Sequence, residues 1–381
     1  MEKTYQSLHA LASLRFDDAA CRTLRGPYGG CRACEQACPA GVLAVDAERV
    51  ALKDGCHNCG RCMAACPTGA LQLEGFESTW NAPADAVEPL RIDCWKVPRR
   101  ADADGLRVPC LGGLSVGRIL QMWQAAGARG LFVMDRGWCG HCSAGGGERH
   151  AATRALGRAQ DWLIDAGVER ERLPRFVREL LPVKRMPLAI PDAALQRPVS
   201  RRNFFRAAAA RAMDAAQAAK PQAAGFMPYV RGASDERSRL LAGVTAAARQ
   251  TNRPLPVSLF STAILGDDCA GHGVCARICP TAALSLKTDA ADGGRTLAFD
   301  GAGCIACGSC ARACPEQALR IVAAKTVPAG RIELKHWDER ECEGCGEPFA
   351  DGSGTALCPS CGGNQTLASD AFGALYGGAP A

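Results

Sequence analysis

Residues 56–67 read Cys56-His-Asn-Cys59-Gly-Arg-Cys62-Met-Ala-Ala-Cys66-Pro67. Its cysteines are separated by two, two and three residues and are followed by proline. A second copy of the pattern occupies residues 304–315. In this spacing three thiolates bind one [4Fe–4S] cluster, and the fourth binds a neighbouring cluster. The chain is therefore predicted to bind iron–sulfur clusters and to move electrons.

The hexapeptide that begins Cys-Pro and ends in leucine is an internal repeat. Its four copies begin at Cys38, Cys66, Cys279 and Cys314. Each copy closes a cysteine-rich loop and leads into a short apolar strand, such as residues 71–73. Two pairs of repeats predict two domains, residues 15–80 and residues 253–330, each a pseudo-twofold duplication. These domains resemble the dicluster ferredoxins of bacteria, and the resemblance implies two [4Fe–4S] clusters in each.

The crossed ligation of dicluster ferredoxins suggests how the eight cysteines of residues 15–80 are shared. One cluster is expected to take Cys38, Cys56, Cys59 and Cys62. The other is expected to take Cys21, Cys31, Cys34 and Cys66, although an insertion separates Cys21 from Cys31. Zinc in the same loops is the alternative, but zinc sites favour two separated cysteine pairs.

The second ferredoxin-like domain has a histidine where one cysteine is expected. Its complete cluster would use Cys279, Cys304, Cys307 and Cys310. The other site consists of Cys269, His272, Cys275 and Cys314. If the imidazole of His272 ligates iron in a [4Fe–4S] cluster, it should raise the reduction potential, as histidine does in Rieske centres. The alternatives are a [3Fe–4S] cluster without the histidine, and no cluster at all.

Residues 88–182 read as a small α/β domain with a four-cysteine site. Short apolar strands at 90–93, 106–109 and 131–134 alternate with a helix at 115–126, which indicates a parallel sheet. A cysteine follows each strand within a few residues, and the set is Cys94, Cys110, Cys139 and Cys142. Because the carboxyl ends of parallel strands share one edge, the four thiols are expected to converge. They would hold a [2Fe–2S] cluster or zinc; buried cysteines without a ligand are the alternative.

Two segments of this domain carry a further resemblance. Residues 108–115 read Val-Pro-Cys-Leu-Gly-Gly-Leu-Ser, and residues 138–147 read Trp-Cys-Gly-His-Cys-Ser-Ala-Gly-Gly-Gly. Over about 60 residues the domain resembles the delta subunit of methyl-viologen-reducing hydrogenase. The resemblance implies a [2Fe–2S] cluster and electron relay to heterodisulfide reductase-type partners. An extra cysteine of that family, near the first ligand, is absent here because Cys94 is followed by Trp95-Lys-Val.

Residues 331–366 are predicted to form a zinc ribbon. Its ligands would be Cys342, Cys345, Cys358 and Cys361, and a glycine after each pair permits the turn around the metal. Rubredoxin-type iron is the alternative, and similar terminal ribbons occur in ferredoxin-like subunits of hydrogenase complexes. Residues 183–252 are expected to be a linker with one or two helices, and residues 367–381 a mobile tail. These groups use all 23 cysteines of the chain.

The composition agrees with several small metal-stabilised units. Aromatic residues make up 6% of the 381 residues, and bound metals replace part of a large core in small domains. The net charge of +6 gives no case for nucleic acid as a partner. No apolar run approaches the roughly 18–20 residues of a membrane span. The N-terminus lacks a signal-peptide core, so a cytoplasmic location is expected.

The predicted fold class is a multidomain mixture of α+β and α/β. It comprises two ferredoxin-like dicluster domains, a parallel α/β domain between them and a zinc ribbon. The favoured function is an electron-transfer subunit of a cytoplasmic oxidoreductase complex, between a catalytic dehydrogenase-, hydrogenase- or reductase-type partner and a second carrier. No nucleotide fingerprint or catalytic residue set is found. The alternatives are an enzyme with its own active site at the middle domain or at an open iron, and a non-catalytic maturation or scaffold protein.

Overall fold

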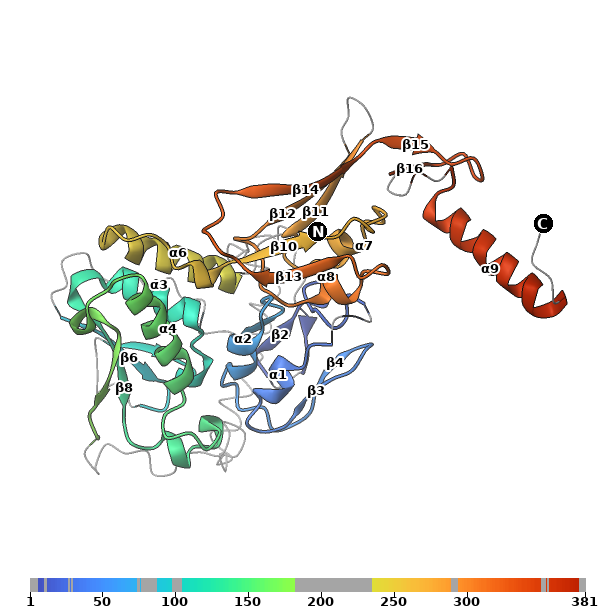
Figure 1. Cartoon of the computed structure of the whole chain (residues 1–381). Helices are drawn as coiled ribbons and strands as arrows, with labels where there is room; N and C mark the ends of the chain where they lie inside the picture. The colour runs from blue at the N-terminus through green and yellow to red at the C-terminus, as the bar shows by residue number, and fades with distance from the viewer. Residues whose placement is uncertain are drawn as a thin grey trace, which may run out of the picture. The chain divides into compact units, whose positions relative to one another are not determined.

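In the part of the chain that the structure describes, the fold mixes a parallel sheet with several antiparallel sheets (Figure 1). The computed structural model describes residues 6–9, 12–26, 28, 30–73, 76, 88–97, 105–181, 235–288, 294–350, 354 and 356–376. The chain divides into two compact units. The first comprises Met1–Cys21, Arg32–Ile164 and Val168–Val230, and the second comprises Arg22–Cys31, Asp165–Gly167 and Arg231–Ala381.

The first unit begins with a ferredoxin-like domain of short elements. These are β1 (Gln6–Ser7), β2 (Leu14–Phe16), α1 (Ala33–Gln36), β3 (Leu43–Val45), β4 (Val50–Leu52), α2 (Arg61–Ala65) and β5 (Leu71–Leu73). Strand β2 pairs antiparallel with β1 and β5, and β3 pairs antiparallel with β4. Leucines on the inner faces of these strands, Leu14, Leu43, Leu52 and Leu73, are buried. The alternating pattern of each strand thus supplies an apolar wall beside the cysteine loops.

The second unit repeats this topology. Its elements are β10 (Ser261–Leu265), α7 (Val274–Ile278), β11 (Leu284–Thr288), β12 (Arg295–Asp300), α8 (Ser309–Arg312) and β13 (Leu319–Ala323). Strand β10 pairs with β13, and β11 pairs with β12, both antiparallel. A further strand, β14 (Arg331–Trp337), pairs with β12, and its Trp337 joins the buried core of Leu284, Phe299 and Leu319. Residues predicted to begin the ribbon therefore extend this sheet instead.

The four Cys-Pro repeats share one backbone geometry. The cysteine before each Cys-Pro is the second residue of a short helix: Cys34, Cys62, Cys275 and Cys310. The third residue after each Cys-Pro cysteine has a positive φ, namely Gly41 (63°), Gly69 (66°), Ala282 (50°) and Gln317 (54°). This left-handed region favours glycine, so the loops hold Ala282 and Gln317 against their intrinsic preference. The internal duplication is present in the backbone as well as in the sequence.

Gln317→Gly is expected to stabilise the second ferredoxin-like domain by about 0.5–1 kcal/mol. A side chain in the left-handed region costs about 1–2 kcal/mol, and the extra freedom of glycine in the unfolded chain offsets roughly 0.5–1 kcal/mol of the gain. The exposed side chain of Gln317 makes no core contact that would be lost. The urea midpoint for loss of cluster absorbance should rise for Gln317→Gly and fall for Gly69→Ala. A midpoint that falls in both variants would contradict the argument.

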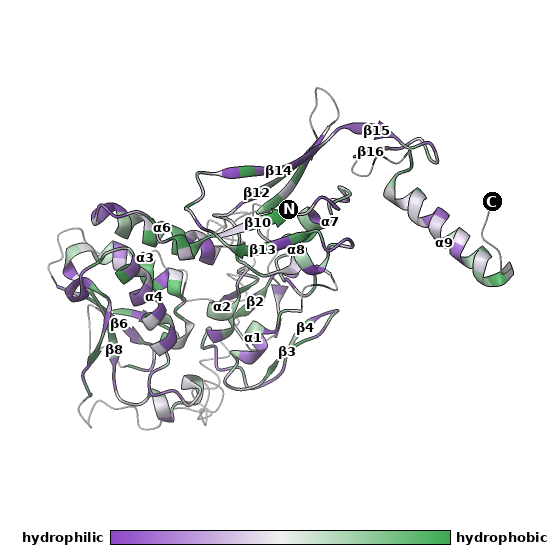
Figure 2. Ribbon diagram, in the orientation of Figure 1, coloured by the Kyte–Doolittle hydropathy of each residue, from purple (hydrophilic) through white to green (hydrophobic). Residues whose placement is uncertain are grey.

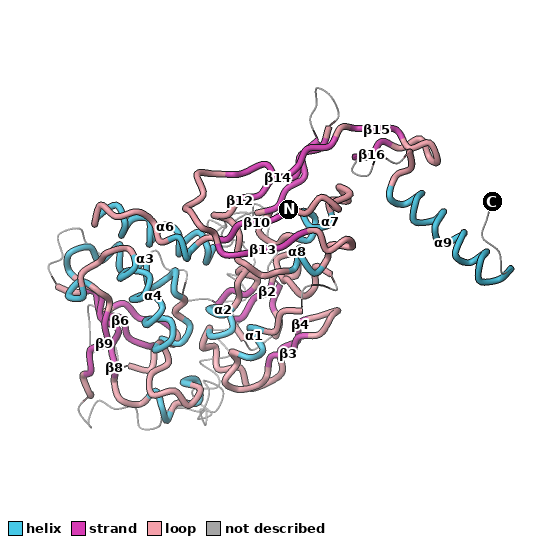
Figure 3. Tube along the Cα trace, viewed as in Figure 1, coloured by secondary structure: helices cyan, strands magenta, loops and turns pink. Residues whose placement is uncertain are grey.

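The middle domain of the first unit is built on a parallel sheet, as predicted. Its elements are β6 (Leu90–Cys94), β7 (Leu106–Val108), α3 (Val116–Ala126), β8 (Leu131–Asp135), α4 (Thr153–Asp165) and β9 (Arg175–Arg178). The strand order is β7-β6-β8-β9, with every neighbouring pair parallel. Ser115 caps α3 by accepting a hydrogen bond from the Arg118 N–H. Figure 3 shows α3 and α4 beside β6, β8 and β9, and both helices bury an apolar face.

The remaining described α-helices and strands belong to the second unit. They are α6 (Asp235–Gln250), β15 (Glu339–Glu341), β16 (Pro348–Ala350) and α9 (Pro359–Tyr376). Of the predicted linker, α6 is described and residues 183–234 lie outside the described residues. Helix α9 extends to Tyr376, into the segment for which the sequence predicts a mobile tail. In Figure 2 its ribbon mixes hydrophobic and hydrophilic colours, and Leu367 and Leu375 are 68% and 76% exposed, so it has no well-packed apolar face.

Candidate metal centres

The first ferredoxin-like domain contains a cavity that is lined by one set of four predicted ligands. The cysteines around it are Cys38, Cys56, Cys59 and Cys62, and four leucines line the rest with Pro39, Ala40 and residues 57, 58 and 60. The hollow measures about 380 Å³, part of it open to solvent. Burial raises the pKa of Cys62, and the neighbouring thiols of Cys59 and Cys56 raise it further. Four thiols around one apolar cavity form a donor set that fits a [4Fe–4S] cluster.

A second cavity of the same kind lies in the second ferredoxin-like domain. Its cysteines are Cys279, Cys304, Cys307 and Cys310, and Leu284, Phe299 and Ile321 are among the apolar residues around them. The hollow measures about 320 Å³, again partly open to solvent. Burial raises the pKa of Cys310 to about 12, with further contributions from Cys279, Cys307 and Cys304. In both domains, therefore, three cysteines of one loop and the Cys-Pro cysteine of the other loop line the same cavity.

The loops that carry these cysteines turn their backbone N–H groups toward sulfur. In three loops the residues directly before and after the second predicted ligand have a left-handed backbone. They are Asn58 and Gly60 around Cys59, Gly271 and Gly273 around His272, and Ala306 and Gly308 around Cys307. As a result the N–H of Asn58 donates to Cys56 Sγ over 3.5 Å, and that of Ala306 to Cys304 Sγ over 3.4 Å. The loop around His272 therefore has the same backbone turn as the two loops with cysteine in that position.

The four cysteines of the middle domain converge at the carboxyl edge of its sheet. Burial raises the pKa of Cys110 to about 12, and the nearby thiols of Cys59, Cys94 and Cys139 also raise it. Burial likewise raises the pKa of Cys139 to about 11, with Cys94 and Cys142 as neighbours. The Gly112 N–H donates to Cys110 Sγ over 3.4 Å, and Lys96 Nζ donates to Cys142 Sγ over 3.0 Å. The metal centre expected at these four thiols stays a prediction.

Packing around this edge fixes the strand ends that carry the cysteines. Asp93, immediately before Cys94, forms a buried ion pair with Arg136 at 2.6 Å. Arg136 also donates to the Glu179 carbonyl over 3.1 Å, which ties the turn after β8 to the end of β9. His141 is exposed, whereas His150 is buried and lies 3.2 Å from the Met134 carbonyl through Nε2. Burial lowers the pKa of His150, which suits a neutral structural histidine.

Within the first unit, the middle site packs directly against the loop of Cys59. We call this contact the junction; it is formed by Cys59, Arg61 and Phe76 on one side and by Cys110, Gly113, Cys142 and Gly145 on the other. Cys59 and Cys142 are buried in one cluster with Ala144, and Cys110 packs against it. Arg61 donates to the Gly145 carbonyl over 3.0 Å and pairs with Glu148 at 3.4 Å. Two cysteine-rich sites therefore share a buried wall.

The remaining predicted set of the first ferredoxin-like domain is Cys21, Cys31, Cys34 and Cys66. The Ala70 N–H donates to Cys66 Sγ over 3.3 Å, as expected for a cluster loop. Thr23 lies in the segment inserted between Cys21 and Cys31. Its hydroxyl donates to the Cys31 carbonyl and accepts from the Cys31 N–H, which holds the two ends of this segment together. Cys31 belongs to the second unit and the other three to the first, so the grouping of the four stays a prediction.

The site with the histidine brings three thiols together. Burial raises the pKa of Cys275 to about 11, and the neighbouring thiols of Cys269 and Cys314 raise it too. His272 Nδ1 lies 2.9 Å from Glu316 Oε1. Lys335 donates to the Cys269 carbonyl over 3.1 Å, which holds the start of the loop against β14. The structure thus adds Glu316 to the four predicted residues.

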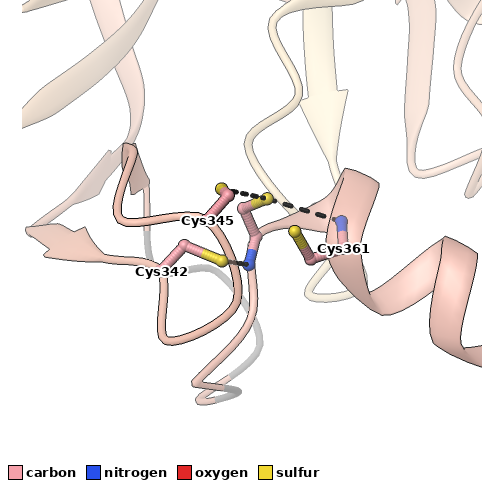
Figure 4. A group of neighbouring side chains, drawn as sticks. Cys342, Cys345 and Cys361 are labelled. Atoms are coloured by element: carbon pink, nitrogen blue, oxygen red, sulfur yellow. Dashed lines mark hydrogen bonds between the residues drawn. The ribbon is translucent and has the colours of Figure 1, made fainter.

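The terminal cysteines form a compact tetrad. The sulfur atoms of Cys342, Cys345, Cys358 and Cys361 all lie within 4.8 Å of one another and could hold a metal ion. Figure 4 shows Cys342, Cys345 and Cys361 directed toward a common centre. Gly346 has a φ of 76° and turns the first knuckle, as expected. The second knuckle differs from the expectation, because Cys361 and Gly362 lie in the first turn of α9.

Acid is expected to release metal from this tetrad. The Cys358 and Gly344 N–H groups donate to Cys342 Sγ and hold the pKa of Cys342 at about 6, below the ordinary thiol value. Without metal, the Cys342 thiolate is therefore present above pH 6 and is lost as the pH falls through 6, whereas the neighbouring thiols raise the pKa of Cys361 to about 12, so a bound metal must displace that proton. A chelator should remove the metal much faster at pH 5 than at pH 7.5, and Cys342→Ser should lose it at pH 7.5. Equal release at both pH values would contradict this account.

Four residues near these sites were not identified from the sequence: Arg61, Lys96, Arg237 and Glu316. Arg237 of α6 donates to the Leu259 and Ala302 carbonyls and lies near Cys304. Charged residues of this kind carry no spacing signal, because their partners are distant in sequence. Glu316 is the exception. Comparing the Cys-Pro repeats shows a carboxylate only in this copy, where the others have Ala40, Thr68 and Thr281.

Comparison with known families matches two segments of the chain. The model described as a 4Fe-4S binding domain matches residues 52–72 and 298–320, which contain the two motifs with regular spacing. No curated protein matches the chain. None of the described helices combines the length and apolarity that a membrane crossing needs. The chain therefore contains two ferredoxin-type [4Fe–4S] binding domains, one in each half, and these indicate iron–sulfur electron transfer.

Proposed function

We propose that this chain is the electron-transfer subunit of a cytoplasmic oxidoreductase complex, passing electrons between a catalytic redox partner and a second carrier. The junction is the observation that supports this function most. A single ferredoxin-like domain would suffice for a carrier, whereas here a second cysteine site is packed against the Cys59 loop. Bound clusters would supply one-electron centres, and the chain fixes their spacing and surroundings.

The residues around each site would exclude water from the cluster and stabilise the negative charge on its thiolate ligands. Buried leucines line the Cys38–Cys62 cavity, and N–H groups donate to Cys56 and Cys304. Hydrogen bonds to sulfur and low exposure are the means by which proteins adjust cluster potentials. At the middle site Lys96 adds a charged donor to Cys142, and we expect it to favour the reduced state. We favour a [2Fe–2S] cluster there over zinc, because a redox-inert ion beside the Cys59 loop would not extend the relay.

Metal analysis of anaerobically purified protein tests this function. Four [4Fe–4S] clusters, one [2Fe–2S] cluster and one zinc ion predict about 18 iron atoms and one zinc per chain. Stepwise reduction with reduced methyl viologen, followed by EPR, should then show separate iron–sulfur signals that are reversibly reoxidised. A colourless preparation that holds only zinc would overturn the proposal. Substrate turnover by the isolated chain would instead favour an enzyme with its own active site.

A further inference from the structure

The four Cys-Pro repeats allow an internal comparison of ligand positions. The copies agree in helix placement and in the left-handed residue, whereas one copy differs in the second ligand and one carries a carboxylate after Cys-Pro. His272 replaces a cysteine, and Glu316 occupies the position of Ala40, Thr68 and Thr281. Both departures fall at the same predicted site, that of Cys269, Cys275 and Cys314. Two independent substitutions would not be expected to coincide in this way.

The two departing residues also touch. His272 Nδ1 and Glu316 Oε1 are 2.9 Å apart, and each side chain is 25% exposed. The other carboxylate oxygen of Glu316 lies 3.7 Å from Cys314 Sγ. In the two threonine repeats the hydroxyl oxygens of Thr68 and Thr281 lie 3.7 and 3.8 Å from their own cysteine sulfurs. The carboxylate of Glu316 thus takes the place of the threonine hydroxyl beside sulfur and reaches on to the histidine.

This contact has a chemical meaning at a metal site. A histidine that binds metal through one ring nitrogen usually donates the N–H of the other to a carboxylate, which fixes its tautomer and orientation. With Nδ1 engaged by Glu316, Nε2 is the ring nitrogen left for iron. Replacing a thiolate by a neutral imidazole also removes one negative charge from the ligand set, and the carboxylate of Glu316 restores that charge nearby.

We propose that His272 ligates iron through Nε2 and that Glu316 is its positioning residue. The inference deepens the proposed function and rests on the cluster assignment at Cys269, Cys275 and Cys314. Of the three outcomes open for this site, it favours a four-ligand cluster in which histidine is one ligand. The outcomes it disfavours are a [3Fe–4S] cluster and the absence of a cluster. The loop supports the choice, because Gly271 and Gly273 hold His272 in the same backbone turn as Cys59 and Cys307.

A double-mutant cycle tests the pairing of the two residues. The variants are His272→Cys, Glu316→Thr and the double change, which restores the pattern of the other repeats. We expect His272→Cys alone to lose part of this cluster, because a fourth thiolate would face the Glu316 carboxylate. The double variant should recover it, with a return of up to about four iron atoms per chain. Additive effects of the two changes on iron content would overturn the pairing.

Spectroscopy of the wild-type protein tests ligation itself. The reduced protein should show a strong ¹⁴N hyperfine coupling at one cluster, which changes on ¹⁵N-histidine labelling and is absent in His272→Cys. Glu316→Thr should alter this coupling and raise the midpoint potential of that cluster, whereas Glu333→Thr, which removes an exposed carboxylate of β14, should change neither. Full iron content without any ¹⁴N coupling, or the EPR signal of an oxidised [3Fe–4S] cluster, would refute His272 ligation. Loss of every cluster signal would instead refute the proposed function.

Discussion

Gly145→Ala is expected to remove the metal centre of the middle domain while both ferredoxin-like domains keep theirs. A Cβ atom at residue 145 would lie 2.0 Å from the Cys139 carbonyl oxygen and 3.0 Å from its carbon. Both are backbone atoms of the turn that carries Cys139 and Cys142, so no side-chain rotation can relieve the overlap. We expect a cost of more than about 3 kcal/mol, concentrated in this turn.

The displaced turn would affect the site in two ways. It carries two of the four thiols, and the Gly145 carbonyl accepts the hydrogen bond from Arg61. Moving the carbonyl would break this hydrogen bond, leave Arg61 its ion pair with Glu148, and loosen the junction. About two iron atoms per chain should be lost if the site holds a [2Fe–2S] cluster, and one zinc ion if it holds zinc.

Gly140→Ala is the matched control for this experiment. Gly140 belongs to the same turn, but a Cβ there would make only ordinary contacts, the nearest at 3.7 Å from the Glu148 carbonyl oxygen. Iron and zinc content of the two variants, measured beside the wild type, checks the prediction. If Gly145→Ala retained the full metal content, the four cysteines of the middle domain would not hold a metal in this turn.

Much of the local structure could be predicted from spacing. The two pairs of Cys-Pro repeats predicted the crossed cysteine sets that line the two cavities. The strand–cysteine order of residues 90–142 predicted a parallel sheet, which the structure confirms. Cys94 ends β6 and Cys110 follows β7 by two residues, so these two cysteines lie at one edge of that sheet. Such patterns succeed because ligand spacing and strand period are local properties of the chain.

The structure differs from the predictions where tertiary contacts decide. The sequence of β14 alternates as a strand should, but nothing in residues 331–337 indicates that it pairs with β12. Strand β9 was missed because Arg175–Arg178 is short and largely exposed. Helix α9 contains adjacent glycines and no amphipathic period, so neither propensity nor pattern predicts it. The junction was not foreseen because Gly113 and Phe76 are distant in sequence and carry no motif.

Gly113→Ala is expected to slow electron transfer across the junction while both metal sites remain loaded. A Cβ atom at residue 113 would lie 2.6 Å from the Cys59 carbonyl oxygen and 2.3 Å from Phe76 Cζ. The ring could rotate away, but the carbonyl is backbone. The turn Leu111–Gly113, which directly follows Cys110, must therefore move away from the Cys59 loop. Since neither set of thiols is overlapped, the change should widen the gap between the sites without removing a ligand.

Freeze-quench EPR after mixing with reduced methyl viologen measures this step. In the wild type the signals of the Cys59 cluster and of the middle cluster should appear together, because exchange across a buried contact is fast. In Gly113→Ala the middle signal should lag behind the first, with unchanged iron content. Gly157→Ala in α4, where an added methyl group meets nothing within 4 Å, should behave as the wild type. Simultaneous signals in Gly113→Ala would mean that electrons reach the middle site by another route, and the junction would then be a structural contact alone.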